Sequence, residues 1–230
     1  MPKAEEEQSF VDYLKTVDAP TLSNAIELLK VRPHREGFTP LQVRCLYPEF
    51  GRMCGYAVTA QVETVTESEG SDPERFQELC EAVGQSAKPA VVTFQEIGGY
   101  PDYAAHCGEV MATIFRRLGA TGLVSDCAVR DVHEVRALGF HYFARGCVVS
   151  HASFRIVRVG VPVQVYGVVI RPGELLHADE NGVLLVPDGV EEKLPQAVDQ
   201  VRIHERRLID WVRSEHSSRD HLRDYMVERR

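Results

Sequence analysis

Charged side chains of both signs follow an apolar run in the segment GATGLVSDCAVRD, residues 119–131. The small and apolar residues predict a buried strand, and the charged residues predict a turn and the start of a helix. Asp126 at the strand end can cap that helix. Arg130 and Asp131 then lie near its N-terminal end, where anions and metal-bound anions are favoured. These residues predict an anion or metal site, although a plain helix cap followed by solvated charges is an equally good interpretation of this segment alone.

A second segment, AAHCGEVMATIFRRLGATG, leads directly into the first and predicts a helix over about residues 104–118. Gly108 and Glu109 stand where this helix is expected to begin. The glycine permits a ligand to approach backbone amides closely, and the first helical turn has N–H groups free to bind a carboxylate. Two acidic groups and one arginine thereby fall within one helix–strand–helix unit, which favours a functional site over an isolated cap.

Composition limits the class of protein. The chain has 230 residues, 44% of them hydrophobic and 26% charged, which is typical of one globular domain with a helical tail. No apolar run approaches the roughly 20 residues that span a bilayer, so a membrane protein is not expected. The N-terminus, MPKAEEEQSF, lacks the apolar core of a signal peptide, and a cytoplasmic location is expected. A net charge of −8 argues against a nucleic-acid partner.

The six cysteines are scattered, with no CxxC pair and no histidines at zinc-finger spacing. Neither a disulfide framework nor a structural zinc is therefore expected. Cys107 and Cys127 lie beside the charged segments, where a nucleophilic thiol is one interpretation and a small buried apolar side chain is the commoner alternative. The GxSxG, Walker, HExxH and GxGxxG motifs are absent, which excludes most standard catalytic machines.

Hydrophobic periodicity predicts alternating helices and strands, and therefore an α/β core of two or three layers. Helices are expected over residues 6–17, 20–30, 72–84, 104–118 and 132–138, and strands over residues 54–66, 88–95, 119–124, 141–146 and, as a hairpin or one sharply bent strand, 154–165. We expect residues 1–188 to form one domain, with residues 189–230 as a helical extension that makes oligomer contacts.

Local signals mark caps and turns. Asp18 is expected to cap the second helix, and Asp179 with the Asn-Gly pair that follows predicts a tight hairpin turn. Asp188 and Glu191 form a capping box, which predicts that a long C-terminal helix begins there. The buried stripe of that helix is expected to comprise Leu194, Val198, Val201, Leu208, Ile209 and Val212.

A family resemblance rests on a combination of motifs within residues 20–188. The motifs are Gly108-Glu109, Gly119-Ala120-Thr121-Gly122-Leu123-Val124, Asp126, Arg130-Asp131, Pro172-Gly173-Glu174, Asp179, Asn181-Gly182-Val183 and Pro187. Together they resemble the RraA-like family, which comprises class II 4-hydroxy-4-methyl-2-oxoglutarate/4-carboxy-4-hydroxy-2-oxoadipate aldolases and the regulator of ribonuclease activity A. The resemblance implies a single α/β/α domain similar to the swivelling phosphohistidine domain, with N- and C-terminal helical extensions, assembled as trimers or hexamers.

The resemblance also implies a reaction. This is retro-aldol cleavage of a 4-hydroxy-2-oxo acid to pyruvate, dependent on Mg²⁺ or Mn²⁺, with oxaloacetate decarboxylation as a side activity. The residue roles that it implies are Asp131 as direct metal ligand, Glu109 as ligand through water, Asp126 as an outer contact of the metal site, Arg130 as the group that holds the substrate, and the amides of Gly108, Glu109, Val110 and Met111 as the cradle for the pyruvyl carboxylate. A hard cation with one or two carboxylates suits this chemistry. A Schiff-base route would instead need a lysine, and Lys88 is the only one near the expected ligand loop at residues 97–102, where turn residues follow a strand.

Two positions depart from the aldolase pattern. Cys127 stands where these aldolases commonly have glycine, and Asn24 stands where they often have aspartate. A non-catalytic interaction protein resembling the ribonuclease regulator therefore remains the alternative, with Glu109 favouring catalysis. In the family, a neighbouring subunit usually supplies a C-terminal acidic residue to the site, and the sequence leaves open whether this is Glu191, Glu192 or Glu205.

Overall fold

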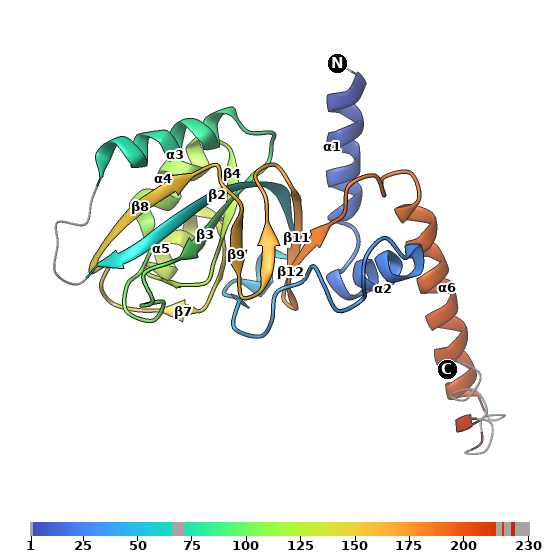
Figure 1. Cartoon of the computed structure of the whole chain (residues 1–230). Helices are drawn as coiled ribbons and strands as arrows, with labels where there is room; N and C mark the ends of the chain where they lie inside the picture. Colours follow the sequence, from blue (N-terminus) through green and yellow to red (C-terminus); the bar gives the residue numbers. More distant parts are fainter. Residues whose placement is uncertain (1, 66–71, 215–217, 219–221, 224–230) are drawn as a thin grey trace.

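A sheet of eight strands forms the centre of the protein in a computed structural model, which describes residues 2–65, 72–214, 218 and 222–223 (Figure 1). The strands run in the order β1-β6-β4-β3-β2-β11-β12, with β8 also paired to β2. The neighbours β2, β3, β4 and β6 are parallel, and the remaining pairs are antiparallel. The strand bounds are β1 Arg44–Cys45, β2 Met53–Val65, β3 Ala90–Glu96, β4 Ala120–Ser125, β6 His141–Ala144, β8 Ser153–Val159, β11 Leu175–Asp179 and β12 Gly182–Val186.

Six α-helices and two small strand pairs surround this sheet in the described residues. The helices are α1 Pro2–Leu14, α2 Ala19–Leu29, α3 Pro73–Gln85, α4 Glu109–Arg117, α5 Val132–Leu138 and α6 Leu194–Arg213, with a 3-10 turn at Pro48–Phe50. The small pairs are β5 Ala128–Val129 with β7 Gly146–Cys147, and β9 Val163–Val165 with β10 Val168–Ile170. The predicted mixed α/β class with helical extensions at both ends is confirmed.

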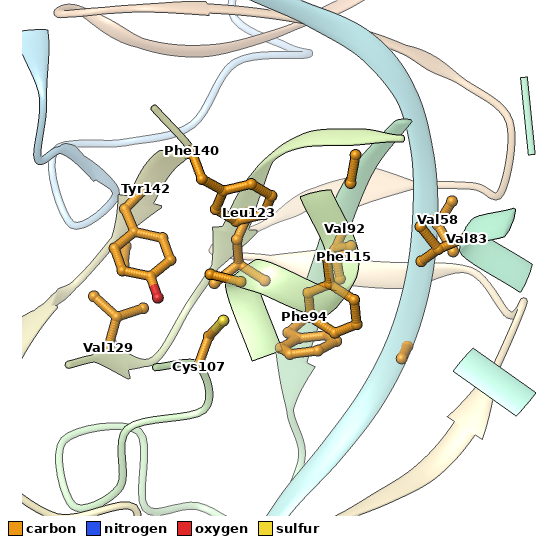
Figure 2. Packing of buried hydrophobic residues seen from close by; sticks show 14 of the residues in the cluster. Val58, Val83, Val92, Phe94, Cys107, Phe115, Leu123, Val129, Phe140 and Tyr142 are labelled. Carbon is orange, nitrogen blue, oxygen red and sulfur yellow. The ribbon is translucent and has the colours of Figure 1, made fainter. Parts of the chain in front are cut away.

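Both faces of the parallel strands are buried, which explains their nearly continuous apolar sequences. Successive side chains point to opposite faces. Val58 and Val92 therefore join the core beneath α3, α4 and α5, shown in Figure 2, whereas Ala57 and Val91 pack beneath the β9–β10 hairpin. Phe115 of α4 lies against Phe94 of β3 in the first of these cores, with ring centroids 6.4 Å apart. This packing fixes the position of α4 against the sheet.

A separate apolar cluster joins α1, α2 and α6 to the β11–β12 hairpin, and Figure 1 shows these helices gathered at that end of the sheet. Asp18 caps α2 by accepting a hydrogen bond from the Thr21 N–H (2.9 Å), as predicted. The predicted hairpin turn is also confirmed. Asp179 is fully buried there, and its carboxylate accepts hydrogen bonds from the N–H groups of Ala19 (2.7 Å) and Asn181 (2.8 Å). One carboxylate thus ties the start of α2 to the hairpin.

The start of α6 differs from the prediction. The helix begins at Leu194 after a Lys193 cap that makes no side-chain hydrogen bond, so the Asp188–Glu191 capping box is not formed. The buried Val190 is the reason, because its carbonyl accepts the Leu194 N–H (2.7 Å) and the turn is shaped by burying both apolar side chains. Most of the predicted tail beyond residue 214 lies outside the described residues.

Two further expectations are corrected. Of the predicted stripe on α6, Leu194, Val198 and Val201 are buried, but Ile209 and Val212 are each 43% exposed, because this half of the helix extends away from the body (Figure 1). The predicted hairpin of residues 154–165 is instead two strands, β8 paired to β2 and β9 paired to β10, separated at Gly160 with φ 68°. In the part of the chain that the structure describes, no helix is both long and apolar enough to cross a membrane.

Candidate active site

Two extended segments meet where β3 and β4 end. Ala105 forms an isolated parallel bridge with Ala128, and the Arg130 N–H donates to the Cys107 carbonyl (3.0 Å). Because this pairing uses the backbone groups of the residues before Glu109, α4 begins at Glu109, as the Gly108–Glu109 pair predicted, and not at the expected outer bound near residue 104. The pairing also brings the start of α4 beside the Arg130–Asp131 pair.

The Asp131 carboxylate lies directly at the start of α4. Its Oδ2 atom accepts a hydrogen bond from the Glu109 N–H (2.9 Å) and lies 3.6 Å from Nε of Arg130. Gly108, which precedes the helix, leaves the space that these side chains occupy. A Cβ atom at Gly108 would stand 2.4 Å from Asp131 Oδ2 and 3.0 Å from Arg130 Nε. The absence of a side chain at Gly108 therefore makes room for the Asp131 and Arg130 side chains, whereas the predicted approach of a ligand to the amides stays a prediction.

Asp131 also has an uncommon backbone conformation. Its φ and ψ angles of 56° and 42° lie in the left-handed region, which costs a non-glycine residue about 1 kcal/mol or more. Asp131 is the cap residue of α5, yet its side chain makes no capping bond to that helix. The conformation instead directs the carboxylate to the start of α4.

This cluster is open to solvent. The side chains of Arg130 and Asp131 are each 36% exposed, Glu109 is exposed, and Val110 is 73% exposed. The first intrahelical bond of α4 runs from the Ala112 N–H to the Gly108 carbonyl (3.0 Å). The amides of the first turn precede that bond and have no intrahelical acceptor; the Glu109 amide already donates to Asp131 Oδ2, which leaves the Val110 and Met111 amides as candidates for binding an anion.

Asp126 does not cap a helix. The short strand β5 follows it, and its Oδ1 atom accepts a hydrogen bond from the Glu96 N–H (2.8 Å). Burial raises the pKa of Asp126 to about 7, the hydrogen bond from that amide opposes the shift, and the nearby Glu96 charge adds to it. The predicted cap is therefore wrong, because residues 128–129 pair with β7 before the chain can turn into α5.

A second, fully buried polar cluster lies behind the exposed one. Nε2 of His106 is 3.0 Å from Oε2 of Glu96, and the Thr64 hydroxyl donates to the same oxygen at 2.8 Å. Sγ of Cys127 lies 3.7 Å from this oxygen. The side chains of His106 and Glu96 are 0% and 1% exposed. The Nδ1 atom of His106 has no hydrogen-bond partner among the described residues, so the ring makes its polar contacts through Nε2.

Sequence analysis missed Glu96 and Thr64 as members of this cluster. Glu96 ends an apolar strand and directly precedes the turn residues IGGYPD at positions 97–102, and a carboxylate at such a strand end was the available signal. Burial alone would raise the pKa of Glu96, but hydrogen bonds from His106 and Thr64 lower it to about 2. The carboxylate is therefore ionised at neutral pH inside the protein.

The structure limits the roles of the thiols and of Lys88. Burial raises the pKa of Cys107 to about 12 and raises that of Cys127 as well, so in the absence of a metal both are neutral thiols at pH 7. This agrees with small buried side chains and disfavours a free nucleophilic thiolate. Lys88 precedes β3 and donates to the Val83 carbonyl, at the end of the strand opposite to Glu96. It is therefore badly placed for a Schiff-base route.

The acidic residues considered near the C-terminus lie elsewhere in the chain. Glu191 and Glu192 precede α6, and Glu205 on α6 accepts a hydrogen bond from Asn24 Nδ2 (3.1 Å). These positions belong to the end of the sheet formed by β11 and β12, whereas Asp131 follows β5 near β4 and β6 (Figure 1).

Comparison with known proteins identifies a family whose model matches most of this chain. The RraA-like family (Aldolase/RraA) matches residues 18–185. A protein from Halalkalibacterium halodurans, named a putative 4-hydroxy-4-methyl-2-oxoglutarate aldolase, is 36% identical over 115 residues, which are 47% of this chain and 54% of that protein. The chain thus spans about half the length of this curated relative.

Solved structures share the fold. An uncharacterized protein from Pseudomonas syringae pv. tomato has a TM-score of 0.69 at 24% identity, with 94% of this chain and 97% of that chain covered. RraAS2 from Streptomyces coelicolor, described as an unusual member of the RNase ES inhibitor RraA protein family, has a TM-score of 0.63 at 24% identity, with 90% and 96% covered. At these identities the likeness concerns the fold.

Proposed function

Since the chain belongs to the RraA-like family, we propose that it is a divalent-metal-dependent aldolase that cleaves a 4-hydroxy-2-oxo acid to pyruvate, with oxaloacetate decarboxylation as a side activity. One observation carries this proposal. The Arg130–Asp131 pair is held at the start of α4, over a glycine that leaves room for it. A carboxylate, a guanidinium and free helix amides are thereby placed around one partly exposed point, as binding of an anionic oxo acid and a cation requires.

The residues present fit a hard divalent cation such as Mg²⁺ or Mn²⁺. Asp131 would be its direct ligand, and Glu109, exposed in the first turn of α4, would hold it through water. Such ions keep several waters and need only one or two protein carboxylates. The Asp131 carboxylate, which would bind the ion, fills the space beside Gly108, and a methyl group added at Gly108 would displace it. When bound, the cation would supply Lewis-acid stabilisation for the negative charge that develops on the substrate's keto oxygen.

The chain's own residues would bind and orient the substrate. The Val110 and Met111 amides of the first turn of α4 are suited to the pyruvyl carboxylate, where the helix dipole adds to their attraction. Arg130 can grip a substrate carboxylate or hydroxyl with its fork of N–H donors. Because Arg130 is only partly exposed and its backbone is bonded to Cys107, it would hold the scissile bond in one orientation. Asp126, whose Oδ1 atom accepts the Glu96 N–H, would serve as an outer contact of the metal site.

The test is pyruvate release from 4-hydroxy-4-methyl-2-oxoglutarate and from oxaloacetate, with chelated protein, before and after addition of Mg²⁺ or Mn²⁺. Turnover restored by metal is the expected result. Arg130→Ala and Asp131→Ala should remove it. The matched controls Arg117→Ala, on an exposed arginine at the end of α4, and Asp210→Ala, on an exposed aspartate of α6, should retain it. Equal activity in the Asp131 variant and the wild type would refute the proposed metal ligand.

A second candidate is a non-catalytic interaction protein. The specific observation is the fold shared with RraAS2, together with Cys127 and Asn24 at positions where aldolases of the family commonly differ. No turnover from correctly folded protein, with either substrate and either metal, would favour this candidate.

We also propose that the protein is a trimer or hexamer. Ile209, on the half of α6 that extends from the body, is 43% exposed, and Ile203, nearer the start of the helix, is 52% exposed; exposed large apolar side chains of this kind suit an interface (Figure 1). The proposed partners are a small oxo acid and further copies of this chain, and nucleic acid is not among them, in line with the net charge of −8.

A further inference from the structure

The buried cluster of Glu96, His106, Cys127 and Thr64, here called the inner cluster, is separate from the proposed substrate site. Its donor atoms come from four stretches of chain: the end of β2, the end of β3, the extended segment before α4, and the β4–β5 connection. It contains one carboxylate, one imidazole and one thiol whose ligand atoms all lie within 4.8 Å of one another. The proposed reaction uses none of these groups.

The spacing of the donor atoms suits a small metal ion. Zinc binds sulfur at about 2.3 Å and nitrogen or oxygen at about 2.0–2.2 Å, so the donors of a tetrahedral site stand roughly 3.3–3.6 Å apart. In the inner cluster, Glu96 Oε2 is 3.0 Å from His106 Nε2 and 3.7 Å from Cys127 Sγ. These two separations are within a few tenths of an ångström of the tetrahedral values, and the third pair, His106 Nε2 and Cys127 Sγ, lies within 4.8 Å, so modest side-chain movements would place all three atoms on one ion. The Thr64 hydroxyl, 2.8 Å from Glu96 Oε2 and 3.0 Å from His106 Nε2, offers a fourth donor atom, the second oxygen of the set.

The charges and donor types also suit a transition metal. Glu96 with a Cys127 thiolate would contribute two negative charges, which neutralise a divalent cation in a site without solvent. Mixed sulfur and nitrogen donors select zinc-like ions over Mg²⁺, which prefers oxygen alone. On binding, the ion would replace the proton of the Cys127 thiol, which is released to solvent, and His106 would bind through Nε2 as the neutral tautomer that carries its proton on Nδ1.

We propose that Glu96, His106 and Cys127 form a site for a Zn²⁺-class transition-metal ion, distinct from the Mg²⁺ or Mn²⁺ site at Asp131. The ion would cross-link the ends of β3 and β4 to the segment that leads into α4. These are the segments that position Gly108 and the Arg130–Asp131 pair. Metal in the inner cluster would therefore stabilise the framework of the substrate site without touching the substrate.

Cobalt provides the first test, because Co²⁺ bound to a thiolate has a charge-transfer absorption band in the near ultraviolet that oxygen-bound Co²⁺ lacks. Chelated wild-type protein titrated with Co²⁺ is expected to develop this band at one equivalent, and Zn²⁺ is expected to displace it. Cys127→Ser and Glu96→Gln should each abolish the band or weaken Co²⁺ binding by more than about tenfold, since even loss of an outer contact of a metal ligand costs about 10–100-fold.

Matched controls identify the thiol and separate the two metal sites. Cys107→Ser removes the neighbouring buried thiol and should keep the band. Asp131→Ala should also keep it while losing turnover, so failure of the inner site and failure of the proposed aldolase are distinguishable. A band that persists in Cys127→Ser, or its absence in wild-type protein at saturating Co²⁺, would overturn the proposal and leave the inner cluster as a hydrogen-bond network only.

A measurement on unaltered protein covers the case in which the variants do not fold. The zinc-edge X-ray absorption spectrum of wild-type protein with one equivalent of Zn²⁺ should contain one sulfur neighbour at about 2.3 Å and lighter neighbours at about 2.0–2.1 Å. A shell of nitrogen and oxygen alone would refute coordination by Cys127. Zn²⁺ should also raise the melting temperature of the chelated protein, and this rise should be the same with and without added Mg²⁺.

Discussion

Gly108→Ala is the sharpest test of the proposed substrate site, because it should damage activity while sparing the fold. The added Cβ atom would stand 2.4 Å from Oδ2 of Asp131 and 3.0 Å from Nε of Arg130. Ordinary contact begins near 3.4 Å, so the Asp131 carboxylate must retreat by about 1 Å. It can do so at little cost, because both side chains are 36% exposed.

The expected magnitude follows from these displacements. The backbone of Gly108 is extended, with φ −132°, which alanine adopts without strain, and alanine restricts the unfolded chain more than glycine. The free energy of unfolding should therefore change by less than about 1 kcal/mol. A misplacement of about 1 Å at a catalytic group can cost about 100-fold in rate, equivalent to about 2.7 kcal/mol in the activation free energy. We expect kcat/KM for pyruvate release to fall by that factor.

Steady-state kinetics with saturating metal and a thermal melt of the same preparation are the assay. Gly146→Ala is the matched control, since this nearby glycine has open space around its Cβ position and its φ is not in the left-handed region. Wild-type kcat/KM in Gly108→Ala would refute the placement of the reaction at this point. If activity fell only as far as a lowered melting temperature explains, the claim that Gly108→Ala damages the site and spares the fold would be refuted.

Four other outcomes are expected. Arg130→Ala should lower kcat/KM by roughly 100- to 1000-fold with an unchanged circular dichroism spectrum, and a loss below tenfold would contradict its role in orienting substrate. Burial raises the pKa of Asp126 from 3.8 to about 7, so the folded state binds the extra proton and stability falls as pH rises from about 4 to 7. The free energy of unfolding of Asp126→Asn should therefore exceed that of the wild type by up to roughly 4 kcal/mol above pH 7 and by little at pH 4. If variant and wild type had the same denaturant midpoint at both pH values, this cost of burying a charged Asp126 would be excluded. Asp179→Ala should destabilise the protein by about 3 kcal/mol, because the buried Ala19 N–H and the partly buried Asn181 N–H lose their acceptor, whereas the exposed Asp188→Ala should be neutral in the same melt. Light scattering should give the mass of a trimer or hexamer, and a monomer would contradict the proposed interface on α6.

Local signals predicted most of the elements correctly. The cap at Asp18, the hairpin turn after Asp179 and the alternating strand from residue 54 all depend on near neighbours in the sequence, and all are confirmed. The predictions failed where a distant partner competed with a local signal. The first turn expected around residue 104 is instead extended, because its backbone pairs with Ala128.

Residue types and spacing by themselves determined the α/β class, the hairpin turn and the marking of Gly108, Glu109 and the Arg130–Asp131 pair as residues of interest. Only the tertiary structure decided that Asp131 reaches the start of α4 and that Asp126 instead receives the amide of Glu96. It also decided that four side chains far apart in the sequence meet in the buried inner cluster: Glu96, His106, Cys127 and Thr64. Periodicity and capping act over a few residues, whereas strand pairing joins positions tens of residues apart and fixes which side chains can meet.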